Sequence, residues 1–144
     1  MKKTIMLFAG TTEGRRICEF LAVKKCIIHV YVTTEYGKEL LPGKNNVHIH
    51  VGKMDEKQMS DEIKAIHPDI VIDATHPYAT QVTHNIKEAC DSRHIFYVRV
   101  LREENTEKAG NNADNIIYTE TMKDVVRLLN DDRFIHKNVL MTTG

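Results

Sequence analysis

The stretch from Asp73 to Ala79 (DATHPYA) gathers the side chains of this protein that are best suited to proton transfer and ring binding. An acid, a hydroxyl, an imidazole and a phenol stand within six residues. The imidazole of His76 can donate a proton or bind a carboxylate, and the phenol of Tyr78 can donate a hydrogen bond or stack on a ring. A purely structural interpretation of this stretch is also open, because Asp73 can cap a helix and Pro77 suits the first turn of a helix.

A second stretch, Ala9 to Arg15 (AGTTEGR), is a candidate phosphate-binding turn. A strand that turns into a helix presents backbone N–H groups at the positive end of the helix dipole. Gly10 can bring the backbone close to a pyrophosphate, and Thr11 and Thr12 offer hydroxyls. The dinucleotide fingerprint G-x-G-x-x-G is only partly met, because Gly10 and Gly14 stand four apart. A tight turn that needs glycine for packing alone stays open as the alternative.

A third stretch, Thr33 to Pro42 (TTEYGKELLP), bears on which nicotinamide cofactor would fit. An NADP site offers hydroxyls and a cation to the 2′-phosphate, which favours the pair Thr33 and Thr34 with Lys38 nearby. Glu35 favours NAD instead, since an acid at this place accepts hydrogen bonds from the ribose hydroxyls. A polar loop with a solvated lysine is the remaining interpretation.

All three stretches follow apolar runs that are typical of buried parallel strands. The pattern predicts strands over residues 4–8, 27–33, 47–51, 69–73 and 95–100, and helices over 13–24, 55–66 and 78–90. This alternation predicts an α/β fold, a Rossmann-like parallel sheet with helices on both faces in three α/β/α layers. Ligands bind beyond the carboxyl ends of the strands in such sheets, where the three stretches would lie.

Composition excludes several classes of function. The 20 basic and 20 acidic residues cancel, which gives no electrostatic reason to expect nucleic acid or an anionic membrane as partner. The three cysteines lack any CxxC spacing, so neither a disulfide framework nor a zinc site is predicted. This use of cysteine predicts a protein of the reducing cytoplasm. His48 and His50 would share a face of a strand nearer the sheet edge, but no third ligand is evident, so no metal is predicted.

The last residues predict that this chain is the first half of a longer protein. After a polar connector over 103–115, the pattern indicates a short strand over 116–119 and a helix over 122–129. Residues 138–144 (NVLMTTG) then resemble another strand that runs into a glycine turn. We therefore expect a Rossmann-like nicotinamide-binding domain over 1–135 and the truncated start of a second α/β half over 136–144.

Taken together, GTTEGR (10–15), TEYGKELL (34–41) and DATHPYA (73–79) resemble the precorrin-6A reductases of cobalamin biosynthesis, including their cobalt-precorrin counterparts. The segment VGKMDEKQM (51–59) fits between these motifs. The resemblance implies an enzyme that transfers hydride from NADPH, with NADH as the other possible donor, to a double bond of a tetrapyrrole, precorrin-6A or cobalt-precorrin-6A. It also implies two Rossmann-like halves with the substrate between them.

The same resemblance implies roles for individual residues. His76 and Tyr78 would border the nicotinamide and the macrocycle as candidate catalytic residues. Lys38 stands where an arginine is typical, which would replace a bidentate phosphate contact by a point charge. A nucleotide-binding Rossmann module without catalysis is the alternative. The residues implied to bind the cofactor are Gly10, Thr11, Thr12, Glu13, Gly14, Arg15, Thr33, Thr34, Lys38, Ala74 and Thr75.

Overall fold

The computed structural model describes residues 2–101, 117, 119–132 and 138. Its contacts divide the chain into two compact units, residues 1–103 and 104–144, and each is described by itself. The domain boundary expected at residue 135 stays a prediction. Most of the strand expected over 138–144 lies outside the described residues. Of the strand expected over 116–119, residues 116 and 118 also lie outside them, and residues 117 and 119 belong to no helix or strand.

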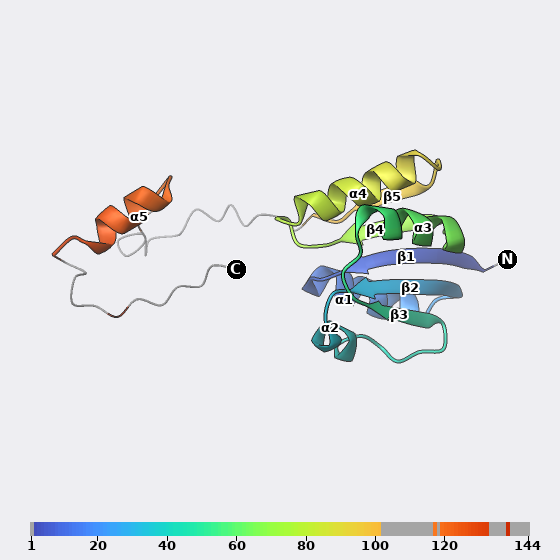
Figure 1. Ribbon diagram of the computed structural model, residues 1–144. Coiled ribbons are helices and arrows are strands. Elements are labelled where there is room, and N and C mark those ends of the chain that lie inside the picture. Colours follow the sequence, from blue (N-terminus) through green and yellow to red (C-terminus); the bar gives the residue numbers. More distant parts are fainter. Residues whose placement is uncertain (1, 102–116, 118, 133–137, 139–144) are drawn as a thin grey trace. The chain divides into compact units, whose positions relative to one another are not determined.

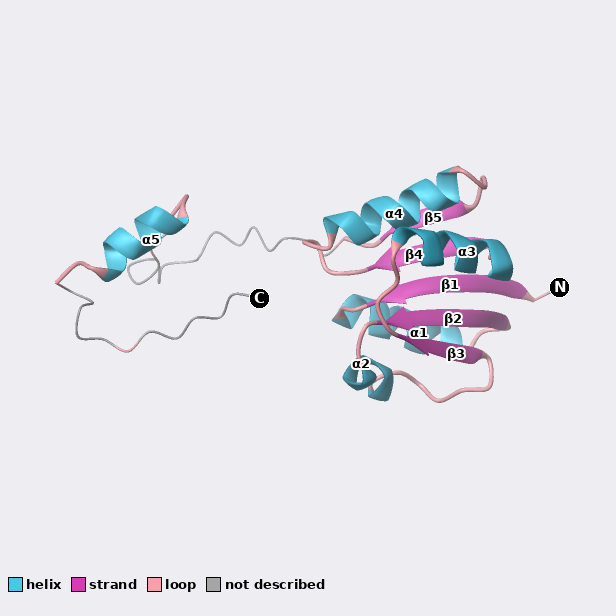
Figure 2. Ribbon diagram, in the orientation of Figure 1, coloured by secondary structure: helices cyan, strands magenta, loops and turns pink. Residues whose placement is uncertain are grey.

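Residues 2–101 form one sheet of five parallel strands with four helices around it (Figures 1 and 2). The strands are β1 (Lys3–Ala9), β2 (Cys26–Val32), β3 (Val47–Val51), β4 (Ile70–Ala74) and β5 (Phe96–Arg99). The helices are α1 (Thr12–Ala22), α2 (Glu35–Glu39), α3 (Glu56–Ile66) and α4 (Thr80–Asp91). The strand order β3-β2-β1-β4-β5 places the reversal of topology between β1 and β4.

Two hydrophobic clusters on opposite faces of the sheet make the three layers. Side chains alternate along the central strand β1, so Ile5 and Leu7 pack on the α1 side with Cys18, whereas Met6 and Phe8 pack on the side of α3 and α4. Because both faces are covered, β1 is apolar throughout its buried part. The predicted Rossmann-like α/β/α fold is confirmed.

Two helices differ from the prediction. The five-residue helix α2 was not expected, because so short a segment carries no periodicity; the Thr34 hydroxyl caps it by accepting from the Gly37 N–H at 3.0 Å. Helix α4 begins at Thr80, so the prediction that Pro77 occupies its first turn is wrong. The Ala79 N–H instead donates to the His76 carbonyl at 2.9 Å, which closes a turn before the helix.

The histidines of β3 lie at the sheet edge, as predicted, and a third histidine from β2 joins them. His29 stacks against His48 and His50, with ring centroids 5.1 and 5.4 Å away, and its Nδ1 lies 3.1 Å from Nε2 of His50. Among the described residues, no three His, Cys, Asp or Glu side chains are arranged to hold a metal ion. The three imidazoles form a stack of rings.

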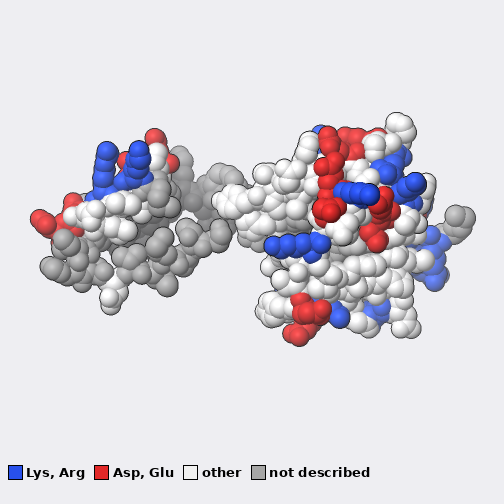
Figure 3. All heavy atoms as spheres, in the orientation of Figure 1, with Lys and Arg blue, Asp and Glu red and all other residues white. Residues whose placement is uncertain are grey.

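The second unit contains one described helix, α5 (Met122–Leu129), which confirms the helix predicted over these residues. Thr121 and Asp124 form a capping box at its start. None of the helices in the described parts of the chain is both long and apolar enough to cross a membrane. Figure 3 shows acidic and basic side chains close together on the face of the first unit that carries α3 and α4.

Asp69, just before β4, ties this strand to the start of β1. Its carboxylate accepts from Lys3 Nζ at 2.7 Å and from the Thr4 N–H at 2.8 Å. These two hydrogen bonds, that from Lys3 foremost, hold the pKa of Asp69 below its usual range. Because the folded pKa lies below the unfolded one, this stabilisation is present above the unfolded pKa and is lost as pH falls through the folded pKa.

We expect Asp69→Asn to lower the urea midpoint of unfolding at neutral pH, where the wild-type carboxylate is charged in both states. The difference in urea midpoint between wild type and variant should decrease from about pH 5 downward, as the wild-type carboxylate becomes protonated. Urea titrations at several pH values measure both effects. A difference in urea midpoint that stayed constant into strongly acid solution would show that the Asp69 carboxylate does not stabilise the fold in this way.

Candidate functional site

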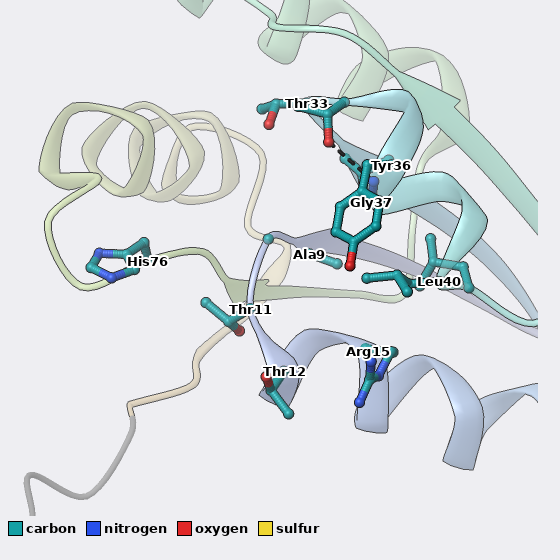
Figure 4. A pocket seen from close by; sticks show the side chains of 13 residues that line it. Ala9, Thr11, Thr12, Arg15, Thr33, Tyr36, Gly37, Leu40 and His76 are labelled. Atoms are coloured by element: carbon teal, nitrogen blue, oxygen red, sulfur yellow. Dashed lines mark hydrogen bonds between the residues drawn. The ribbon is translucent and has the colours of Figure 1, made fainter. Parts of the chain in front are cut away.

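A cavity of about 470 Å³ lies at the carboxyl ends of β1 and β2, at the edge of the sheet where ligands bind in parallel α/β folds (Figure 4). The turn before α1 and the helix α2 form its two sides, and His76 reaches it from the segment after β4. The three stretches selected from the sequence therefore meet at one place. The lining residues are Ala9, Gly10, Thr11, Thr12, Arg15, Val32, Thr33, Thr34, Tyr36, Gly37, Leu40, Leu41 and His76.

The two glycines of the first turn have different surroundings. A Cβ added to Gly10 would have no described atom within 4 Å, so the backbone there borders open space. A Cβ added to Gly14 would lie 3.0 Å from both Cα and Cβ of Ala9 and 3.3 Å from Cβ of Ala74. Gly10 thus leaves the cavity open, while Gly14 lets α1 pack closely on the sheet.

Thr11 fixes the geometry of this turn. Its hydroxyl donates to the Ala74 carbonyl at 2.8 Å and accepts from the Gly14 N–H at 3.2 Å, which caps α1. A hydroxyl has one proton, so that of Thr11 is already used inside the protein. Thr12 opens α1 and borders the cavity, where the positive end of the helix dipole favours an anion.

Arg15 is the basic side chain among the residues that line this cavity. Its Nε is buried and has no hydrogen-bond acceptor within the described part of the chain; Oε1 of Glu19, one turn on, lies 3.7 Å away. The Arg15 side chain as a whole is 39% exposed, so its guanidinium can meet an anion in the cavity. Lys38 is not among the lining residues, and its Nζ lies 3.5 Å from Oε2 of Glu35.

Helix α2 gives the opposite side of the cavity an aromatic and apolar surface. Tyr36 is 69% exposed, and Leu40 and Leu41 lie beyond it. Figure 4 shows Tyr36 and Leu40 across the cavity from Arg15. Thr33 and Thr34 complete this side at the end of β2. A planar ring would find apolar contact here, with a cation opposite it.

His76 borders the main cavity and also a hollow of about 50 Å³, which Glu13 and Thr75 help to line. Its Nδ1 accepts a hydrogen bond from the Tyr78 N–H at 3.2 Å. A backbone N–H can only donate, so the neutral ring carries its proton on Nε2. Tyr78 is 88% exposed, with its ring centroid 5.1 Å from that of His76, and it is not among the cavity-lining residues.

A buried carboxylate stands behind this segment. The Asp73 side chain is fully buried, and it accepts from the Thr75 N–H at 3.0 Å, the Thr75 hydroxyl at 2.7 Å and the Tyr97 hydroxyl at 3.1 Å. Arg99 Nη1 donates to its Oδ1 at 2.6 Å. Asp73 is therefore not the helix cap considered from the sequence. The sequence pattern did not predict that Tyr97 and Arg99 contact Asp73. The one signal for this pairing was that Asp73 and Arg99 are charged residues in two otherwise apolar strands.

Comparison with known proteins identifies relatives of this chain. A family model described as "Precorrin-6x reductase CbiJ/CobK" matches residues 4–144. The cobalt-precorrin-6A reductase of Salmonella typhimurium is 29% identical over 141 residues, which are 97% of this chain and 51% of that protein. The cobalt-precorrin-6A reductase of Methanocaldococcus jannaschii is 33% identical over 126 residues, 86% of this chain and 48% of its own length. The chain thus spans about half the length of these curated relatives.

Solved structures give the same picture of the fold. A structure described as "CobK precorrin-6A reductase" matches with a TM-score of 0.63 and 25% identity over 76% of this chain and 43% of that one. The Bordetella bronchiseptica enzyme WbmG, solved in complex with NAD and UDP, matches with a TM-score of 0.59 at 16% identity over 69% of this chain and 37% of its own. At 16% identity, the match to WbmG shows similarity of fold alone.

Proposed function

The chain belongs to the precorrin-6x reductase family CbiJ/CobK, and from this membership we propose that it binds a reduced nicotinamide cofactor for the reduction of a tetrapyrrole double bond. The observation that carries the proposal is the cavity at the ends of β1 and β2, where Gly10 borders open space beside the start of α1. The curated relatives are cobalt-precorrin-6A reductases, so precorrin-6A or cobalt-precorrin-6A is the proposed substrate. In the whole protein this chain would be the cofactor-binding half, working in the cytoplasm.

The residues present fit such a cofactor. The pyrophosphate would lie over Gly10 and the start of α1, because these combine free space with a positive helix end. The adenosine would lie toward Thr33, Thr34 and α2, as it does at the second strand of other dinucleotide sites. Because Arg15 lines the cavity and Lys38 does not, Arg15 is the proposed ligand of a 2′-phosphate. NADPH is accordingly the proposed donor, in preference to NADH.

The reacting end would lie toward His76. When bound, the cofactor supplies the hydride, and the contribution of this chain is to hold donor and acceptor close together. His76 presents an Nε2–H donor there, suited to a carboxamide oxygen or a substrate carboxylate. The exposed ring of Tyr78 offers a surface on which a macrocycle can stack. Ala74 and Thr75 shape the wall between these groups and the first turn.

Titration with NADPH and NADH, followed by nicotinamide fluorescence, tests the proposal. We expect both to bind and NADPH to bind more tightly. Arg15→Met should weaken NADPH about tenfold, the worth of one charge-assisted hydrogen bond, and should leave NADH nearly unchanged. Lys38→Met is the matched control, since it removes a cation that does not line the cavity.

Two results would argue against this assignment. Absence of binding by either cofactor would remove the cofactor site itself. Equal losses of NADPH and NADH affinity in Arg15→Met would keep the site but remove the 2′-phosphate contact from Arg15.

A further inference from the structure

Arg99, on the edge strand β5, does more than neutralise a buried acid, and we infer that it is the positioning residue that sets His76 at the cofactor cavity. The inference rests on the proposed function, since it takes the cavity as the place of the reaction. Arg99 does not line that cavity and is a sequence neighbour of none of its residues. Its effect would pass through the segment from Asp73 to Tyr78.

The contacts of Arg99 span that segment. Nη1 donates to Oδ1 of Asp73 at 2.6 Å and to the Thr75 hydroxyl at 2.8 Å, and it lies 3.5 Å from the Asp73 carbonyl. Nη2 donates to the His76 carbonyl at 3.4 Å. The parallel register pairs Asp73 directly with Arg99, so both side chains leave the sheet on the same face. One guanidinium thus contacts three residues of this segment, Asp73, Thr75 and His76.

Neutralising the carboxylate alone would not need this arrangement. Asp73 is fully buried, so a cation beside it is required, and a lysine ammonium would meet that need as a point charge. The planar guanidinium differs because its second nitrogen reaches past the acid to the His76 carbonyl. This additional contact is the one that bears on the site.

The orientation of His76 follows from the same contact. Its carbonyl also accepts from the Ala79 N–H, and its ring accepts from the Tyr78 N–H, so the turn and the ring are held together. With the carbonyl fixed by Arg99, the Nδ1 of His76 stays bonded to the backbone and Nε2–H remains the free donor. Loss of the contact should release the turn and allow both ring tautomers.

Nitrogen-15 spectra of the histidine rings in mildly alkaline buffer test this directly, because histidine is neutral there and its tautomers are distinguishable. A His76→Gln spectrum identifies the signals of His76. We expect a single dominant Nε2–H tautomer in the wild type and a mixture in Arg99→Lys and Arg99→Gln. Tyr97→Phe is the matched control: it removes a hydrogen bond to the same carboxylate from the same strand, with no contact to Thr75 or His76 among those described.

The kinetics of the whole protein provide a second measurement. We expect Arg99→Lys to lower kcat for tetrapyrrole reduction about tenfold, with an unchanged KM for NADPH, because misplacement affects the reacting end alone. Urea midpoints show which variants are folded, and Arg99→Gln replaces Arg99→Lys if the latter is not.

A single His76 tautomer in both folded Arg99 variants would overturn the inference, as would an equal mixture in Tyr97→Phe. The spectra need no cofactor, so failure of NADPH to bind the wild type would refute the proposed function while the tautomer comparison still decides the structural effect of Arg99.

Discussion

Gly10→Val is expected to weaken NADPH binding severely and to leave the fold intact. A Cβ at this position has no described atom within 4 Å, and the backbone is not in the left-handed region, so the added Cβ causes neither a clash nor backbone strain. The new methyl groups would instead enter the space proposed for the pyrophosphate. Loss of two charge-assisted hydrogen bonds there corresponds to a decrease in affinity of about hundredfold or more.

Fluorescence titration and urea unfolding of the same preparation separate the two effects. Gly43→Val is the matched control, because a Cβ there also meets no described atom within 4 Å and the residue does not line the cavity. Both variants should unfold near the wild-type midpoint, and only Gly10→Val should lose binding. Undiminished NADPH affinity in Gly10→Val would place the pyrophosphate elsewhere.

Gly14→Val is expected to do the opposite, by destabilising the fold itself. Its Cβ would lie 3.0 Å from the backbone Cα of Ala9, which cannot turn away as a flexible side chain can. Helix α1 would have to move off β1 and β4 and disturb the cluster around Cys18. Such overpacking costs about 2–3 kcal/mol in free energy of unfolding.

The alanine variants make this test sharper. Replacing a helical glycine by alanine ordinarily stabilises a helix by up to about 1 kcal/mol, so a loss of stability in Gly14→Ala would come from the contact alone. Gly10→Ala, with open space around its Cβ, should remain near the wild type. A Gly14→Ala protein as stable as the wild type would show that α1 accommodates the extra methyl group.

The elements that the sequence predicts best are those whose periodicity reports burial on both faces. The apolar runs of β1 and β4 are continuous because helices cover both sides, and their positions were predicted to within two residues. The start of α4 was misplaced because Pro77 is compatible with a first turn but does not require one. Here the turn closed by the His76 carbonyl decides where the helix begins.

The site was predictable in its location but not in its connections. The carboxyl ends of parallel strands lie at one edge of the sheet, so the sequence alone predicts that the three loop stretches lie together. The pairing of Asp73 with Arg99 depends on the register of β4 against β5, which no local pattern encodes. Likewise Arg15 and Lys38 were both available as cations, and only the structure distinguishes the one that lines the cavity.

The bridge that Thr11 makes from the first turn to the Ala74 carbonyl has an entropic consequence. The turn beside the proposed phosphate site is bonded through this hydroxyl to the end of β4, where the segment that carries His76 begins, so the motions of the turn and of that segment are coupled. Their relative order is established when the chain folds, and a dinucleotide that spans both would not have to impose it on binding.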